Sequence, residues 1–306
     1  MRSGALACIF TAEDRGLPLF FDGSIKTKGM ETGMTKQKLQ RIGLYIDAAN
    51  ITRNGGYGMR FDVLRDFACR DHGDPIRLNA YVAYDEDRAK TDHDYRERTF
   101  NFHSTLRDYG FKVIEKTVMW YVDEAGNRFG KANADLDMAV DTLLQSEKLE
   151  KVVMATGDGD FIQVVRALQN KGCRVEAVAF QNVSSNLKRE VDLYTSGYLI
   201  PNLLPLEGTD PKKSWGEPGS RVRGICYTYN RSKNFGFMRY LVRIGPGELW
   251  ITDTRRADSP YATAFAHESA FGAHTEITQL PSRDMIFEFD VTQGEKGIQA
   301  SNIVRI

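Results

Sequence analysis

Hydrophobic runs of strand length alternate with helical segments from Arg41 onward. The runs IGLYI, LNAYVAY, FKVIEK, KVVMAT and RVEAVAF are separated by segments such as FDVLRDFACRD and DYRERTFNFHSTLRDYG. Alternation of strands and helices is typical of a mainly parallel sheet with helices on both faces. The pattern therefore predicts an α/β domain over residues 41–205.

One segment of this domain departs from the alternation. Between the third hydrophobic run and Asp135, the sequence TVMWYVDEAGNRFGK contains an aromatic strand, a turn at Gly126 and Asn127, and a short return strand. Two short apolar runs joined by such a turn predict a β-hairpin. We expect this hairpin to lie beside the cleft at the end of the sheet.

The sequence pattern is different before and after the α/β segment. EGTDPKKSWGEPGS is rich in Pro, Gly, Ser and charge, which indicates a linker over residues 206–219. Beyond it, short strands with turn signals (RVRGICYTY, FGFMRYL, GELWITD, DMIFEFDV) predict a small all-β barrel over residues 220–306. Residues 1–40 lack sustained periodicity, so we expect a flexible leader there.

The composition indicates the kind of protein and its cellular compartment but says little about its chemistry. With 42% hydrophobic and 27% charged residues, the 306-residue chain is an ordinary globular one, and Lys plus Arg balance Asp plus Glu at 41 each. The four cysteines are widely spaced and contain no CxxC pair, which favours free thiols in a reducing compartment. No apolar stretch approaches membrane-spanning length, so we expect a cytoplasmic protein with no membrane partner.

Acidic residues follow the hydrophobic runs at several points. Asp47 ends GLYID, Asp158 and Asp160 follow KVVMAT, and Asp135 and Asp141 lie in GKANADLDMAVDTLL. The carboxyl ends of parallel strands meet in one crevice, so acids far apart in the sequence can share a cation there. Several carboxylates with few nitrogen or sulfur ligands nearby favour Mg²⁺ or Mn²⁺. The pattern therefore predicts a metal site.

Each acid also has a purely structural interpretation. Asp47 and Asp160 can cap the helices that follow them, and acids early in a helix, such as Asp137, are favoured by its dipole. On the helix from 131 to 144, Asp137 and Asp141 share a face, whereas Asp135 lies in the first turn and points elsewhere. We therefore take Asp135 as the first candidate ligand on this helix and Asp141 as the second.

Two further polar residues lie near these acids in the sequence. Asn50 is placed to orient water or a phosphate, and Lys131 to hold a phosphate or offset the acidic charge, although an exposed lysine is ordinarily just solvated. The five histidines show no zinc-like spacing. The chain also lacks a P-loop and a dinucleotide-binding glycine turn, which disfavours nucleotide-cofactor chemistry.

Taken together, these motifs resemble the NYN family of PIN-like nucleases, which includes the bacterial LabA-like proteins. The likeness covers roughly residues 41–205 and is carried by Asp47, Asn50, Lys131, Asp135, Asp141, Asp158, Asp160, Phe161, Ser185, Leu187 and Asp192. The resemblance implies a PIN-like α/β fold and metal-dependent endoribonuclease activity. It also implies that Asp47, Asp135 and Asp158 are the metal-binding carboxylates, with Asp160 as a further one.

The predicted barrel carries aromatic residues at strand spacing. Phe235 and Phe237 flank a glycine on one strand, Tyr229 precedes them, and Phe265 and His267 follow on a later strand. Such rings stack on the bases of single-stranded RNA, and cationic side chains contact its phosphates. The same aromatics also have the alternative role of filling a small barrel core. The cationic candidates are Arg231, Lys233 and Arg239.

This part of the chain resembles a cold-shock domain, an OB-type barrel that binds single-stranded nucleic acid. KNFGF and FAHES match its two RNA-binding motifs, and IFEFDVTQGEKGIQASNI matches its closing strands. Thr228 and Ala266 depart from the pattern, and the stretch 239–264 is longer than usual. From residue 219 onward, eleven Lys and Arg face nine Asp and Glu, so stacking has to contribute much of the affinity.

The function we predict is a metal-dependent endoribonuclease in which the barrel captures single-stranded or partly structured RNA. Tethering raises the local substrate concentration at the α/β domain. The alternative is a non-catalytic RNA-binding regulator. A third class, a DNA-directed nuclease or a phosphatase, remains open because carboxylate-metal sites do not distinguish ribose from deoxyribose. Single-stranded DNA is thus a further candidate partner, and a homodimer is expected without a predicted interface.

Overall fold

The computed structural model describes residues 39–70, 72–206, 213–245 and 249–306. Of the leader predicted at residues 1–40, only the last two residues are among these, and residues 207–212 of the predicted linker also lie outside them. The leader and the linker therefore remain predictions.

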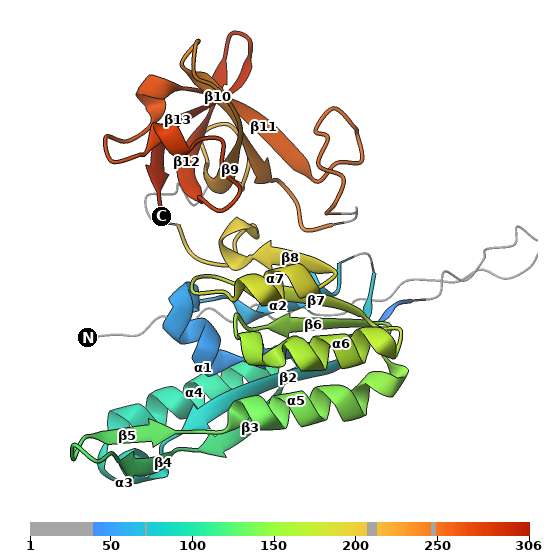
Figure 1. Cartoon of the computed structure of the whole chain (residues 1–306), viewed down its shortest axis with the longest axis vertical. Helices are drawn as coiled ribbons and strands as arrows, with labels where there is room; N and C mark the ends of the chain where they lie inside the picture. Colours follow the sequence, from blue (N-terminus) through green and yellow to red (C-terminus); the bar gives the residue numbers. More distant parts are fainter. Residues whose placement is uncertain (1–38, 71, 207–212, 246–248) are drawn as a thin grey trace, which may run out of the picture. The chain divides into compact units, whose positions relative to one another are not determined.

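The α/β part is built on a sheet of six parallel strands in the order β3-β2-β1-β6-β7-β8 (Figure 1). The strands are β1 (Arg41–Asp47), β2 (Asp74–Tyr84), β3 (Lys112–Thr117), β6 (Lys151–Ala155), β7 (Arg174–Ala179) and β8 (Leu193–Ser196). The predicted fold class, a mainly parallel sheet with flanking helices, is confirmed.

The central strand β1 is buried on both faces, which explains its continuous apolar run. Ile42, Leu44 and Ile46 enter one core, whereas Tyr45 enters the other. Successive side chains of a strand point to opposite faces, so a strand with helices on both sides needs apolar residues at every position. The run IGLYI meets this requirement.

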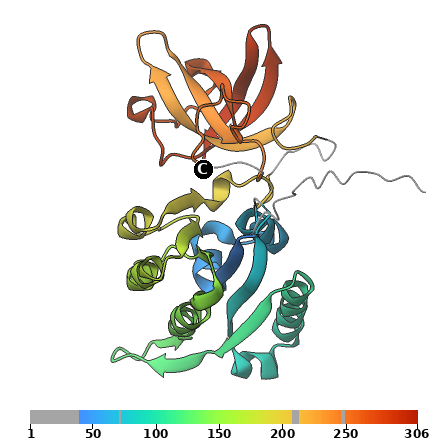
Figure 2. The same cartoon turned by 90° about the vertical axis from the view of Figure 1, so that its right-hand side faces the viewer.

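Helices cover both faces of the sheet (Figure 2). On one side, α2 (Phe61–Ala68) and α4 (His93–Asp108) pack into the core that contains Leu44. On the other side, α5 (Ala134–Gln145), α6 (Ile162–Asn170) and α7 (Ser185–Glu190) pack into the core that contains Tyr45. The buried side chains of α5 and α6 recur at helical spacing, as in Val164, Val165 and Leu168.

The strand order places the switch point of the sheet between β1 and β6. From β1 the chain proceeds outward through β2 and β3, then returns to β6 on the other side of β1 and proceeds through β7 and β8. In open α/β sheets the crevice at the carboxyl ends of the strands at such a point is the usual ligand site. Asp47 ends one of these two strands, and the turn with Asp158 follows the other.

The predicted hairpin is present between β3 and α5. It consists of β4 (Met119–Val122) and β5 (Arg128–Lys131), paired antiparallel, and forms a sheet of its own. The short helix α3 (Glu86–Thr91) lies between β2 and α4 in the chain, and its capping residue Asp85 accepts a hydrogen bond of 3.2 Å from Trp120 Nε1 of the hairpin.

The carboxyl-terminal part is a closed barrel of five strands, as predicted. Its strands are β9 (Arg221–Asn230), β10 (Phe235–Leu241), β11 (Tyr261–His267), β12 (Phe287–Gly294) and β13 (Gly297–Arg305), in the order β10-β11-β13-β12-β9. Alternate residues point inward, including Met238, Tyr240, Phe287 and Phe289, and form a separate buried core.

Two predicted features can be compared with the described residues. The cysteines among them, Cys69, Cys173 and Cys226, are free thiols; Cys173 and Cys226 are buried, and Cys69 is partly exposed. Within the same described ranges, none of the helices combines the length and the apolar character needed to cross a membrane.

Candidate active site

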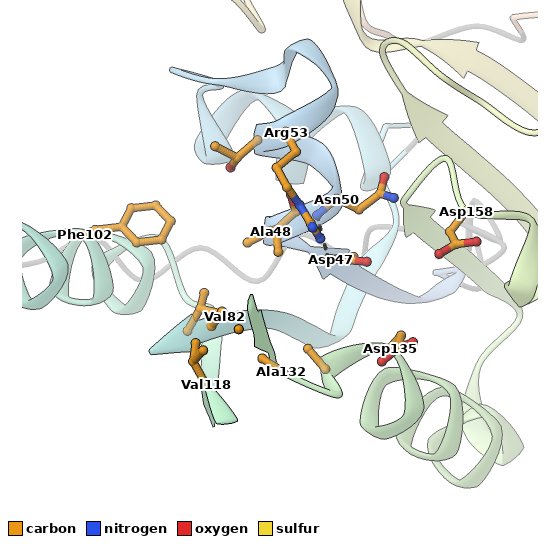
Figure 3. A pocket seen from close by; sticks show the side chains of 15 residues that line it. Asp47, Ala48, Asn50, Arg53, Val82, Phe102, Val118, Ala132, Asp135 and Asp158 are labelled. Atoms are coloured by element: carbon orange, nitrogen blue, oxygen red, sulfur yellow. Dashed lines mark hydrogen bonds between the residues drawn. The ribbon is translucent and has the colours of Figure 1, made fainter. Parts of the chain in front are cut away.

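A cavity of about 570 Å³ lies at the switch point of the sheet. Asp47, Asp135 and Asp158 line it together with several small and apolar residues. Figure 3 shows the three carboxylates on one side and Phe102, Val82 and Val118 on the other. The structure thus brings together three of the predicted metal ligands from three separate segments of the chain.

Asp47 is the most buried of these acids. It ends β1, only 8% of it is exposed, and it caps the short helix α1 (Ala48–Ile51). Its Oδ1 accepts a hydrogen bond of 2.9 Å from the amide nitrogen of Asn50. The interpretation of Asp47 as a helix cap is therefore confirmed, and the same carboxylate also lines the cavity.

Asp158 is held in the turn between β6 and α6. Its own amide donates to Thr156 Oγ1 at 3.2 Å, and its Oδ1 accepts from the amide of Asp160 at 2.9 Å. Gly159 follows it where a Cβ atom would come within 2.8 Å of Ser184 Oγ, so a side chain does not fit without a shift. The glycine lets the turn pack closely while Asp158 stays partly exposed in the cavity.

Asn50 ties the β1 and β6 segments together. Its side-chain oxygen accepts a hydrogen bond of 3.0 Å from the amide of Gly157, which directly precedes Asp158. The amide of Asn50 itself donates to Asp47. This residue therefore positions two of the acids relative to each other, whereas the sequence suggested a contact with water or phosphate.

Replacing Asn50 removes this tie and leaves the buried amide of Gly157 without its acceptor. We expect Asn50→Ala to lower the free energy of unfolding by about 1 to 3 kcal/mol, the cost of an unsatisfied buried amide. Urea unfolding followed by circular dichroism measures the change. Thr52→Ala, an exposed position on the same cavity wall, is the matched control and should unfold like the wild type. Equal stability of all three proteins would contradict the positioning role.

Asp135 reaches the cavity from the third segment. It lies in the first turn of α5, is exposed, and follows Ala134, which is buried under the sheet. The helix α5 packs against β1 and β2, and its first turn lines the cavity together with residues at the carboxyl ends of those strands. A carboxylate in the first turn is also favoured by the helix dipole.

The surroundings of Asp47 shift its pKa. Burial raises the pKa of Asp47, and the negative charges of Asp135 and Asp158 raise it further. The hydrogen bond from Asn50 and the positive charge of Arg53 act in the opposite direction and lower it. A cation bound among these carboxylates would relieve the same repulsion.

Arg53 is a site residue that the sequence reasoning missed. Its Nε donates to the carbonyl oxygen of Ala49 at 3.0 Å, and its side chain lines the cavity near Asp47. The sequence could have indicated this residue, because a helix that continues from Asp47 places residues 49 and 53 on one face. Arg53 gives the acidic cavity an exposed cation suited to a phosphate group.

Two of the predicted ligands lie away from this cavity. Asp160 is exposed and lines two other hollows, one with Gln163 and Arg166 of α6 and one with Asp135 and Phe161. Asp141 accepts a hydrogen bond of 2.8 Å from the buried hydroxyl of Tyr81. Neither residue is among the lining residues of the cavity that contains Asp47.

The remaining polar candidates on this segment are Lys131 and Asp137. Lys131 ends β5, and its side chain lies outside the part of the chain that the structure describes. Asp137 forms an ion pair of 2.7 Å with Lys116 of β3. Its interpretation as a charge with no ligand role agrees with this contact.

The acidic side chains that line the cavity are the carboxylates of three aspartates, the type of donor that suits a hard divalent cation such as Mg²⁺ or Mn²⁺. In the described ranges, no three or more His, Cys, Asp or Glu side chains are grouped closely enough to form a metal-binding set. The three aspartates therefore share the cavity without converging on one point.

The barrel presents a cluster of aromatic rings on its outer face. Phe235, Phe237 and Phe265 lie on the adjacent strands β10 and β11, with ring centroids 5.4 to 6.0 Å apart, and all three are at least partly exposed. We call these three rings the barrel platform. Met238 and Tyr240, at the alternate positions of β10, are buried in the core. Lys233 and His267 are exposed near the same strands, as the sequence suggested.

Tyr229 and Arg239 make contacts that the sequence did not predict. Tyr229 pairs with Gly236, packs against the barrel core and donates its hydroxyl to Glu268 at 2.7 Å, so it is not part of the platform. Arg239 lies over the rings of Tyr227 and Tyr261, at 5.3 and 5.4 Å from their centroids. These two tyrosines were missed, because their position beside Arg239 depends on the strand register.

Comparison with known proteins places the α/β part in a family. The family model of the NYN domain matches residues 41–201. The chain is 27% identical over 161 residues to the "Low amplitude and bright protein LabA" of Synechococcus elongatus, covering 50% of this chain and 82% of that protein. It is also similar, at 20% identity and a TM-score of 0.42, to a crystal structure of a Vibrio parahaemolyticus protein of unknown function. That match covers 53% of this chain and 96% of the other.

Proposed function

Because the chain belongs to the NYN domain family, we propose that the acidic cavity hydrolyses phosphodiester bonds of RNA with the help of Mg²⁺ or Mn²⁺. The observation that carries the proposal is that Asp47, Asp135 and Asp158 line one cavity at the switch point of the sheet. NYN domains have a PIN-like, nuclease-type fold, which supports a hydrolase. Structural roles alone do not require three acids from distant segments to share one cavity.

The residues of the cavity have distinct roles in this proposal. Asp47, Asp135 and Asp158 would hold the cation, which when bound lowers the pKa of water and stabilises charge on a phosphate. Asn50 fixes the distance between the segments that carry Asp47 and Asp158. Arg53 contributes a positive charge that attracts the RNA phosphate to the mouth of the cavity.

We further propose that the barrel binds single-stranded RNA. Its strand order, with β9, β10 and β11 followed by β13 and β12 around the barrel, is the arrangement of an OB-type fold. Such folds bind oligonucleotides on the face of their second and third strands. The barrel platform occupies that face, since Phe235 and Phe237 lie on β10 and Phe265 on β11. This agreement supports the resemblance to a cold-shock domain.

The barrel platform also favours a second candidate function, a non-catalytic RNA-binding regulator. Three adjacent rings that are at least partly exposed suit the retention of RNA whether or not the cavity cleaves it. A cytoplasmic location is part of both proposals and is supported by the free thiols among the described residues.

The preferred polymer can be determined by a binding assay in which RNA and single-stranded DNA compete for the protein.

The test of the proposed reaction is cleavage of an end-labelled, partly structured RNA by the full chain. We expect internal cuts with Mn²⁺ or Mg²⁺, and none after removal of the metal with EDTA. Restoring Mn²⁺ should restore the cuts, which excludes irreversible damage by the chelator. If the protein binds the RNA but leaves it intact over all metal concentrations, the regulator replaces the nuclease.

The same assay has a defined pH dependence. Burial and the neighbouring acids raise the pKa of Asp47, so its proton competes with the cation up to a higher pH than for an ordinary carboxyl group. We therefore expect the Mn²⁺ concentration for half-maximal cleavage to fall as the pH rises through that pKa. A half-maximal concentration that does not change with pH would argue against Asp47 as a ligand.

A further inference from the structure

A second hollow, of about 490 Å³, borders the acidic cavity. The hollow and the cavity have Thr52 and Phe102 in common among their lining residues. Figure 3 shows Phe102 across the cavity from the three carboxylates. The hollow therefore begins on the side of the cavity that lies opposite the acids. We call it the aromatic hollow, because four aromatic side chains line it: Tyr57, Phe61, Phe102 and Tyr109.

Three segments of the chain supply these rings. Phe102 lies on α4 and Tyr109 directly follows the last residue of that helix, a spacing of about two turns that places both on one face. Phe61 begins α2 and packs edge-on against Phe102, with ring centroids 5.5 Å apart. Tyr57 precedes α2 and is 83% exposed, and Phe102 is 37% exposed. The hollow thus offers rings that a ligand can reach.

The aromatic hollow suits a flat, uncharged group. Its charged residues, Arg60 and Asp62, form an ion pair of 2.6 Å with each other. At Gly58, another lining residue, a Cβ atom would meet no other atom within 4 Å, so open space remains there. Sites for small ligands typically have volumes of about 300 to 1,000 Å³ and mainly apolar and aromatic walls. The hollow has these properties and offers no unpaired charge to a phosphate.

We propose that the aromatic hollow binds the unpaired base of a nucleotide whose phosphate lies in the acidic cavity. The inference rests on the proposed function and specifies its substrate as single-stranded RNA. The base of a nucleotide is linked to its phosphate through one sugar, so it reaches the surface next to the phosphate site. Thr52 and Phe102 make the hollow part of that surface. Stacking on aromatic rings accepts any base, because every base has a flat π-face.

Phe102 is the specificity-determining residue in this proposal, because its ring belongs to both the cavity and the hollow. The bases of a duplex are stacked inside the helix, and one of them enters a protein pocket only after unpairing and unstacking. The phosphates, in contrast, are accessible in single and double strands alike. The acids and their cation therefore do not distinguish the two forms of RNA, whereas the hollow does.

The first test measures binding by the full chain with the barrel platform removed through Phe237→Ala and Phe265→Ala. A fluorescent single-stranded RNA is titrated in Ca²⁺, a hard cation with oxygen ligands, and electrophoresis checks that the RNA stays intact. We expect about tenfold weaker binding when Phe102→Leu is added, the loss of one stacked base. Phe102→Tyr keeps the ring and should bind like the parent protein, which separates stacking from packing against Phe61.

Phe100→Leu is the matched control. Phe100 lies on the same helix and is 68% exposed, but it lines neither the cavity nor the aromatic hollow. This variant should bind the RNA like the parent protein. Parent-like binding by Phe102→Leu would overturn the inference, as would a parent protein that does not bind the RNA at all.

A cross-linking experiment locates the base without any substitution. Single-stranded RNA that contains 4-thiouridine is irradiated with the wild-type full chain in Ca²⁺, and mass spectrometry identifies the linked residues. We expect links to the rings of the aromatic hollow in addition to links to the barrel platform. Links to the barrel alone would overturn the inference and leave the hollow to another occupant, such as a second copy of the chain.

Cleavage separates this inference from the proposed function. If the nuclease is active, Phe102→Leu in the otherwise wild-type chain should lower kcat/KM about tenfold for single-stranded RNA and leave it unchanged for fully paired RNA. Equal losses on both substrates would assign the ring to the structure of the cavity and overturn the inference. Absence of cleavage in the wild type, together with binding that depends on Phe102, would overturn the proposed reaction alone.

Discussion

The Asp158→Asn variant should cleave RNA at least about a hundred times more slowly than the wild type, because the catalytic contribution of a bound cation is several kcal/mol. Asn keeps the shape of the side chain, and its oxygen can still accept the hydrogen bond from the amide of Asp160. The turn therefore keeps its structure while the cavity loses one of three negative charges. Single-turnover cleavage of an end-labelled RNA with Mn²⁺ measures the effect.

Asp160→Asn is the matched control for this variant. It removes the same charge from the same turn, two residues away, but Asp160 does not line the cavity that contains Asp47, although it shares a neighbouring hollow with Asp135. We expect the Asp160→Asn variant to retain cleavage within a few-fold of the wild type, as for an exposed charge outside the cavity. Equal loss in both variants would mean that both acids hold the cation, or that the charge of the whole turn matters and not the position of its carboxylates.

The different positions of Asp158 and Asp160 show what the sequence could predict. Strand ends are visible as the ends of apolar runs, so the apolar pattern alone is enough to assign Asp47 and Asp158 to one edge of a parallel sheet. Asp135 followed from its place in the first turn of a helix. These three predictions required only the periods of strands and helices and the rule that parallel strands end together.

The orientation of the other acidic side chains depends on tertiary contacts, which the local sequence pattern does not show. Asp141 lies six residues after Asp135, about 9 Å further along the helix, and there it meets the buried hydroxyl of Tyr81. That tyrosine comes from β2, so only the packing of α5 on the sheet determines the contact. Similarly, Asp160 lies outside the cavity in one turn of 3-10 helix, which the GDGDF sequence does not distinguish from other tight turns.

In the barrel, strand register limits what can be predicted from the sequence in the same way. Alternation along β10 predicted that Phe235 and Phe237 share a face, and they do. Tyr229 was predicted to be a further stacking ring, but it pairs with Gly236, the inward position between the two phenylalanines. A shift of one residue in the register moves a side chain from the platform face to the core. The pairing of β9 with β10 also contains a bulge between Phe237 and Met238, which the sequence does not show.

Replacing two rings of the barrel platform should weaken RNA binding at least about tenfold, because each stacked base contributes about 1 to 3 kcal/mol. We expect this for Phe237→Ala combined with Phe265→Ala, whose rings are partly exposed and lie 6.0 Å apart. The barrel itself should remain folded, since its core is formed by the alternate positions, including Met238 and Ala264. Anisotropy with a fluorescent single-stranded RNA in EDTA measures the affinity, and circular dichroism checks the fold.

Tyr229→Phe provides the control within the same barrel, because it removes only a hydroxyl that binds Glu268 and leaves the inward-facing ring in place. RNA affinity should stay at the wild-type value in this variant, whereas a platform that included Tyr229 would lose a contact. The barrel carries little net charge, so adding salt should weaken wild-type binding only modestly. A steep salt dependence together with full binding by the double alanine variant would show that phosphate contacts, and not the platform, hold the RNA.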